Sequence, residues 1–195
     1  MKIKDRVKPK LPPVEAGVYA GICVGIYDLG EQYSEFYKKY SNKVMFTFEL
    51  PTETIEVDGK QEPRQLSKEF AIASGKKSSL RAFLSAWNSK NYTDEEFADL
   101  EIFQQLGKAA MINVVLNDSG EYANIDSVMP LMKGYPVPKS ETAQLTWDMD
   151  KWDDEAFAAL PEWVQEKIKK STNYQKGHAP ETTVAVTEQT EDCPI

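Results

Sequence analysis

Histidine, cysteine and long apolar runs are all scarce in this chain of 195 residues. Its one histidine, His178, lies in a polar C-terminal stretch, which argues against a histidine-based catalytic triad or a metal site of several imidazoles. Its two cysteines, Cys23 and Cys193, stand far apart and do not make a disulfide framework. No apolar run approaches the length of a membrane-spanning helix, and none follows the basic N-terminus as in a secretory signal. We therefore expect an intracellular protein without a membrane partner.

A glycine-rich phosphate-binding loop is missing as well. Residues 75–78 read Gly-Lys-Lys-Ser and end like such a loop, but Phe70 stands where the motif requires its first glycine. Runs of carboxylates such as residues 153–155 are typical of a solvated helix start, and they leave a metal-dependent nuclease as the enzymatic alternative. We otherwise predict that the chain is not an enzyme and that it uses no metal or other cofactor.

The net charge of -8 is unevenly distributed along the chain. Residues 1–140 hold 18 basic and 19 acidic side chains, whereas residues 141–195 hold 5 and 12. The acidity therefore belongs to the C-terminal part, and the preceding part is nearly neutral. A segregated acidic tail of this kind does not exclude nucleic-acid binding by the rest of the protein.

Alternating apolar residues predict five strands, at residues 17–27, 43–50, 65–73, 109–117 and 121–131. We expect a loop at 28–42, a polar connection at 51–64 with a turn at Asp58-Gly59, a helix from Ser78 and a second helix capped by Thr93 and Glu96. This order is typical of a mainly β protein with helices, a five-stranded OB-fold Greek-key barrel with a helical insertion between strands 3 and 4 and a C-terminal helical extension. A generic α+β domain is the alternative.

The same alternation predicts which side chains face the core. One face of the first strand carries Val18, Ala20, Ile22, Val24 and Ile26, and the other includes Cys23 and Tyr27. The inward residues of the second strand are Val44, Phe46, Phe48 and Leu50, and those of the third are Leu66, Phe70 and Ile72. The first helix presents Leu80, Phe83, Leu84 and Trp87 on one face.

Composition divides the chain into four parts. Residues 1–13 form a basic arm, 14–133 the OB-fold domain, 134–171 a linker and a helical segment, and 172–195 a disordered acidic tail. The helical segment carries Trp147, Trp152 and Trp163 in an acidic context. It is expected either to dock on the barrel as a cap or to bind a partner.

The predicted loop at 28–42 combines aromatic and basic residues. Its aromatic residues are Tyr33, Phe36, Tyr37 and Tyr40, and the lysines among and just after them are Lys38, Lys39 and Lys43. Aromatic faces stack on bases and lysines neutralise phosphates, which is how proteins bind single strands without sequence preference. Further basic residues along or after the third strand extend this predicted interface: Lys68, Lys76, Lys77 and Arg81. Alternatively, Phe36 and Tyr40 fold back on the barrel, and we expect about half of the four rings to do so.

The last residues form a second predicted binding element. Glu191 and Asp192 precede Pro194 and the apolar Ile195. The proline restricts the backbone, Ile195 and a carboxylate fit a pocket with a basic rim, and the acidic pair steers the approach. This pattern predicts that Glu191, Asp192, Pro194 and Ile195 contact partner proteins.

Several short motifs resemble those of a group of small phage proteins found in replication gene clusters. They are Leu11-Pro12-Pro13, Gly17-Val18-Tyr19, Asp28-Leu29-Gly30, Ser78-Ser79-Leu80-Arg81, Leu106-Gly107-Lys108, Tyr122-Ala123-Asn124-Ile125 and Leu160-Pro161-Glu162-Trp163. The resemblance implies an OB-fold protein that coats single-stranded DNA during phage replication or recombination, in the cytoplasm of a bacterial host. The tail is similar to that of bacterial single-stranded-DNA-binding proteins, with Ile195 in place of their terminal Phe, and it implies recruitment of replication or recombination proteins.

Two other hypotheses follow from the sequence. In the first, the barrel and the Trp-rich segment form a module that binds a host or phage replication protein. In the second, carboxylates bind divalent metal and cleave nucleic acid. The free edges of a small barrel also leave homodimerisation open.

Overall fold

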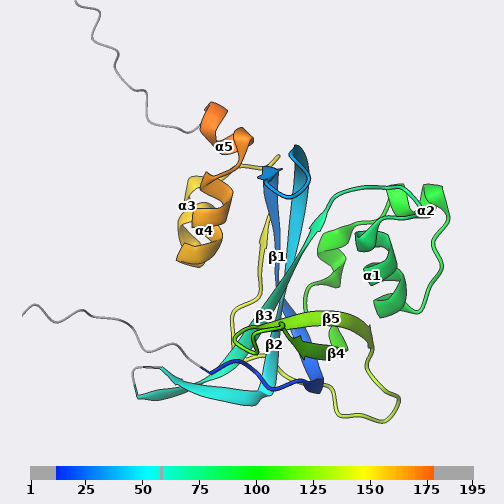
Figure 1. Ribbon diagram of the computed structural model, residues 1–195, viewed down its shortest axis with the longest axis vertical. Helices are drawn as coiled ribbons and strands as arrows, with labels where there is room; N and C mark the ends of the chain where they lie inside the picture. Colours follow the sequence, from blue (N-terminus) through cyan, green and yellow to red (C-terminus); the bar gives the residue numbers. More distant parts are fainter. Residues whose placement is uncertain (1–11, 58, 178–195) are drawn as a thin grey trace, which may run out of the picture.

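The computed structural model of the chain describes residues 12–57 and 59–177 (Figure 1). The strands are β1 (Gly17–Ser34), β2 (Lys39–Val57), β3 (Lys60–Ala71), β4 (Ala109–Leu116), β5 (Ala123–Pro130) and β6 (Leu145–Trp147). The helices are α1 (Ser79–Asn88), α2 (Asp94–Ala98), the 3-10 helix η1 (Ile102–Gln105), α3 (Asp154–Ala159), α4 (Glu162–Lys169) and α5 (Thr172–Gly177). Five strands lie in the order β3-β2-β1-β4-β5 with antiparallel pairing, and β6 pairs with β1 in parallel. The fold is therefore mainly β with a few helices, as predicted.

The predicted loop at residues 28–42 is wrong, because residues 28–34 and 39–42 extend two paired strands and only residues 35–38 form a turn. The antiparallel ladder between β1 and β2 continues to the pair Ser34 and Lys39. Register shifts at Val24 and Leu29 change which side chains face the core. Cys23 and Ile26 consequently share one core although simple alternation puts them on opposite faces. At the second shift, Gly30 has a φ of +68°, a conformation that glycine adopts without strain.

A second hairpin replaces the predicted polar connection at residues 51–64. Strand β2 runs to Val57 and β3 begins at Lys60, so most of the expected connection belongs to two strands. Of the predicted Asp58-Gly59 turn, Gly59 has a φ of +79°, whereas Asp58 lies outside the described residues. Strand β3 ends at Ala71, and Ile72 beyond it is 44% exposed instead of packing beside Phe70.

The main core lies between one face of the sheet and helix α1. The predicted inward residues of β2 are all buried, and so are the predicted apolar residues of α1. Phe46 packs against Phe70, Phe83 and Trp87 with ring centroids 5.4–6.2 Å apart. Helix α2 has the predicted capping box, in which Thr93 and Glu96 satisfy each other's backbone N–H groups.

A second core forms on the opposite face of β1 and β2. Tyr27, Leu29 and Met45 are buried there against side chains of the C-terminal segment: Trp147, Leu160, Val164 and Ile168. Figure 1 shows α3, α4 and α5 gathered on one side of β1, and α1 and α2 on the other. The Trp-rich segment is thus packed on the sheet, as expected of a cap.

Two parts of this C-terminal layer were not predicted from the sequence. Strand β6 adds to the sheet beside residues 25–27 of β1. Residues 172–177, which the sequence assigns to the tail, form helix α5 and bind β1 through Glu31. Thr172 donates to the Glu31 carboxylate at 2.6 Å, and the Glu31 N–H donates to the side-chain oxygen of Asn173 at 2.8 Å.

A buried carboxylate attaches the 134–144 connection to the sheet. Glu49 of β2 is completely buried, and its two oxygens accept the backbone N–H groups of Glu141 and Thr142 at 2.8 and 2.9 Å. Glu49 lies on the same face of β2 as Met45, so the C-terminal layer continues along this face. The outer side of β2 is consequently covered by later parts of the same chain.

We expect Glu49→Gln to loosen this connection. The amide oxygen still accepts one N–H, but the amide NH2 group opposes the other, which costs about 1–3 kcal/mol for an unsatisfied buried group. Hydrogen exchange at the Glu141 and Thr142 amides should accelerate, and Glu53→Gln on the same strand serves as the control. Unchanged exchange at both amides would contradict this role of Glu49.

Candidate nucleic-acid interface

The far end of the β1–β2 hairpin carries all four predicted stacking residues; we call residues 33–40 the aromatic hairpin. Tyr33 and Tyr40 face each other across the two strands with ring centroids 5.0 Å apart. Phe36 and Tyr37 lie in the turn and meet edge to face at 4.9 Å. The expectation that about half of the rings fold back is wrong: Phe36 is 85% exposed and Tyr40 56% exposed. Because β1 and β2 remain paired up to the turn, these rings lie beyond both cores and do not fold back on them.

The predicted lysines of the hairpin lie beside these rings. Lys38 closes the turn with a φ of 51° and pairs with Glu35 at 3.1 Å, both side chains remaining largely exposed. The Lys39 ammonium is 5.6 Å from the centroid of the Tyr37 ring. Cationic and aromatic groups therefore alternate over the same surface, the combination that single-strand binding uses.

A groove of about 460 Å³ runs from the aromatic hairpin to the start of α1; we call it the end groove. The hairpin contributes Tyr37, Lys39, Tyr40 and Lys43, whereas residues 69–73, Ser78 and Ser79 form the other side. Four predicted site residues are thus brought together with the beginning of a helix. The free N–H groups at a helix N-terminus favour anions, and the first turn of α1 has no acidic residue.

Lys76 and Lys77 lie in the turn that precedes α1. Both side chains are exposed, and the Lys76 ammonium is 3.8 Å from the Asp94 carboxylate. They precede Ser78 of the groove in the chain, but neither lysine lines the groove.

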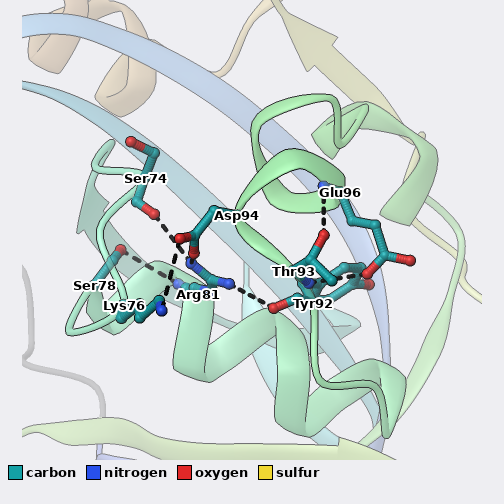
Figure 2. Close-up of polar contacts among 8 residues, drawn as sticks. All are labelled: Ser74, Lys76, Ser78, Arg81, Tyr92, Thr93, Asp94 and Glu96. Carbon is teal, nitrogen blue, oxygen red and sulfur yellow. Dashed lines mark hydrogen bonds and ion pairs between the residues drawn. The ribbon is translucent and has the colours of Figure 1, made fainter.

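Arg81 is placed differently, because its guanidinium is buried in a polar network (Figure 2). It donates to the Asp94 carboxylate at 2.6 Å and to the carbonyls of Ser74 and Tyr92 at 3.3 and 2.5 Å. The hydrogen bond from Arg81 holds the pKa of Asp94 below its ordinary value. Arg81 thus fixes the segment before α2 to α1, and it does not line the end groove.

Lys68 likewise forms hydrogen bonds within the protein. Its ammonium donates to the backbone carbonyls of Ile125 and Asp126 at 2.7 and 2.6 Å, which joins β3 to β5. Burial lowers the pKa of Lys68. The predicted phosphate contacts of Lys68 and Arg81 therefore find no support in their surroundings.

Sequence reasoning missed two charged residues at the groove. Glu69 lines the groove, and Lys167 of α4, which does not line it, forms an ion pair with Glu69. These two residues are 98 positions apart and belong to a strand and a helix with no local pattern in common. No signal in the sequence links them.

Two further predicted elements are the C-terminal partner-binding residues and the N-terminal basic arm. The tail residues Glu191, Asp192, Pro194 and Ile195, and the basic arm before Pro12, lie outside the described residues.

Within 12–57 and 59–177, no three His, Cys, Asp or Glu side chains form a group that could hold a metal ion. None of the helices in these ranges is both long and apolar enough to cross a membrane.

Comparison with known proteins adds no relative. No protein-family profile matches the chain, and neither a curated protein nor a solved structure is significantly similar to it.

Proposed function

We propose that this protein binds and coats single-stranded DNA without strong sequence preference. The observation that carries the proposal is the end groove, where exposed aromatic rings and lysine ammonium groups from the same hairpin line one surface. Rings stack on unpaired bases for about 1–3 kcal/mol each, and lysines offset the phosphate charge. A duplex hides its base faces, so this surface favours the single strand.

We further propose that the fold is an OB-fold. In the observed order, β3 and β5 are the outermost of the five consecutive strands, and these two strands meet when such a sheet closes. Lys68 of β3 bonds carbonyls of β5, which supports closure along this seam. Helix α1 follows β3 in the chain and shares a small cavity with both strands.

The biological setting is a proposal from the sequence. The motifs resembling phage replication-cluster proteins support a role in phage replication or recombination. The acidic residues 191–192, with Pro194 and Ile195, are proposed to recruit replication or recombination proteins.

The test is fluorescence anisotropy of labelled oligo-dT at low and physiological salt, beside a duplex of equal length. We expect tight binding to the single strand alone, with log Kobs falling linearly with log salt by about 0.7 per phosphate contact. Binding that is equal for duplex and single strand, or absent at low salt, would contradict the proposal. A flat salt dependence would count against phosphate contacts.

A further inference from the structure

A carboxylate at the end groove is held between two lysines from distant parts of the chain. Glu69 of β3 is 3.7 Å from the Lys43 ammonium through one oxygen and 2.5 Å from the Lys167 ammonium through the other. Lys43 and Glu69 line the groove, and Lys167 comes from α4. The three side chains have exposed fractions of 26%, 31% and 42%, so solvent and a ligand can reach them.

Helix α4 brings Lys167 to this position through contacts of its own. The side-chain amide of Gln32 donates to the carbonyls of Leu29 and Lys167 at 2.7 and 3.0 Å, which joins the hairpin to the end of the helix. On the adjoining position of α4, Ile168 is completely buried in the second core. The Lys167 backbone is therefore fixed, while its ammonium remains partly exposed.

The two lysines resemble an anion-binding site in which the Glu69 carboxylate supplies the anion. Two ammonium groups converge on two oxygens of one anion, as they would on a phosphodiester. Ion pairs with this much exposure contribute little to stability, because water already solvates the separated charges. Exchanging the carboxylate for a phosphate consequently costs the fold little.

We propose that Lys43 and Lys167 form a phosphodiester-binding site in which Glu69 occupies the phosphate position while DNA is absent. This inference rests on the proposed single-strand binding and adds a residue from the C-terminal layer to the interface. Bound DNA displaces Glu69, so the carboxylate limits affinity instead of contributing to it.

The test compares two matched pairs of variants by oligo-dT anisotropy across a salt series. Glu69→Gln removes the competing charge, and Glu166→Gln makes the same charge change on α4, where Glu166 pairs with Lys169 at 3.5 Å. Lys167→Ala and Lys169→Ala form the second pair, and Lys167→Arg retains the positive charge. Thermal melts establish that each variant is folded.

We expect Glu69→Gln to bind severalfold more tightly with a similar salt dependence, because the DNA makes the same phosphate contact once Glu69 is displaced. Lys167→Ala should bind more weakly, with a salt dependence shallower by about 0.7, because one phosphate contact is lost. Lys167→Arg should bind like the unaltered protein, and the controls Glu166→Gln and Lys169→Ala should change neither affinity nor salt dependence. Weaker or unchanged binding by Glu69→Gln, or an equal effect of each variant and its own control, would overturn the phosphate site while leaving the proposed function standing. Absence of salt-sensitive binding by the unaltered protein would overturn both.

Discussion

Replacing Phe36 and Tyr37 together by alanine is expected to weaken oligo-dT binding by at least about 30-fold. Each base-stacking ring contributes about 1–3 kcal/mol, so two rings correspond to about 2 kcal/mol or more. These are the most exposed aromatic side chains of the hairpin, and their rings contact each other edge to face. Their removal should therefore change the melting temperature very little. Anisotropy titrations and thermal melts measure the two effects separately.

The control for this double variant is Tyr135→Ala. Tyr135 is 41% exposed, close to the 43% of Tyr33, but it lies in the segment after β5 and does not line the end groove. Its loss should leave affinity unchanged. If Tyr135→Ala and the hairpin variant weaken binding equally, the aromatic hairpin is not the stacking surface.

Trp147→Ala is expected to destabilise the protein by about 3–5 kcal/mol, the usual cost of truncating a buried Trp. Trp147 is 2% exposed, and its ring centroid is 4.9 Å from that of Trp152 and 5.4 Å from that of Phe157. It also ends β6, so its loss removes contacts that attach the C-terminal layer to β1. Denaturant unfolding followed by tryptophan fluorescence measures the change.

Trp147→Phe is the matched control for this variant. The indole N–H of Trp147 is buried and has no hydrogen-bond partner among the described residues, so removing it costs no hydrogen bond. We expect a smaller loss of stability than with alanine, because a ring remains in the core. A stable Trp147→Ala protein that has lost only partner binding would instead favour the protein-interaction hypothesis.

Strands and helices with one clear apolar face could be predicted from the sequence. In β2, residues 44–50 alternate strictly, and every predicted inward side chain is buried. The capping box of α2 is equally local, since Thr93 and Glu96 lie three positions apart. Such features are readable because the residues that make them are neighbours in the chain.

The extension of β1 and β2 could not be predicted in this way. Residues 28–42 mix polar and aromatic side chains, and the shift at Leu29 interrupts their alternation. Leu29 is almost completely buried only because the C-terminal layer packs on it. A strand buried by a segment more than a hundred positions later carries no local sign of that burial.

By itself, the sequence determined the mainly β class and the chemistry of the aromatic hairpin, whose rings and lysines lie within a few positions of one another. Only the tertiary structure decided which of the other basic residues are buried within the fold and which are exposed to a ligand. Arg81 and Lys39 are both basic, yet Arg81 is buried with carbonyl and carboxylate partners and Lys39 lines the end groove. A buried cation needs partners to offset its lost hydration, whereas an exposed one remains available to a ligand. Burial depends on which segments pack together, and this packing also brings Lys167 to Glu69.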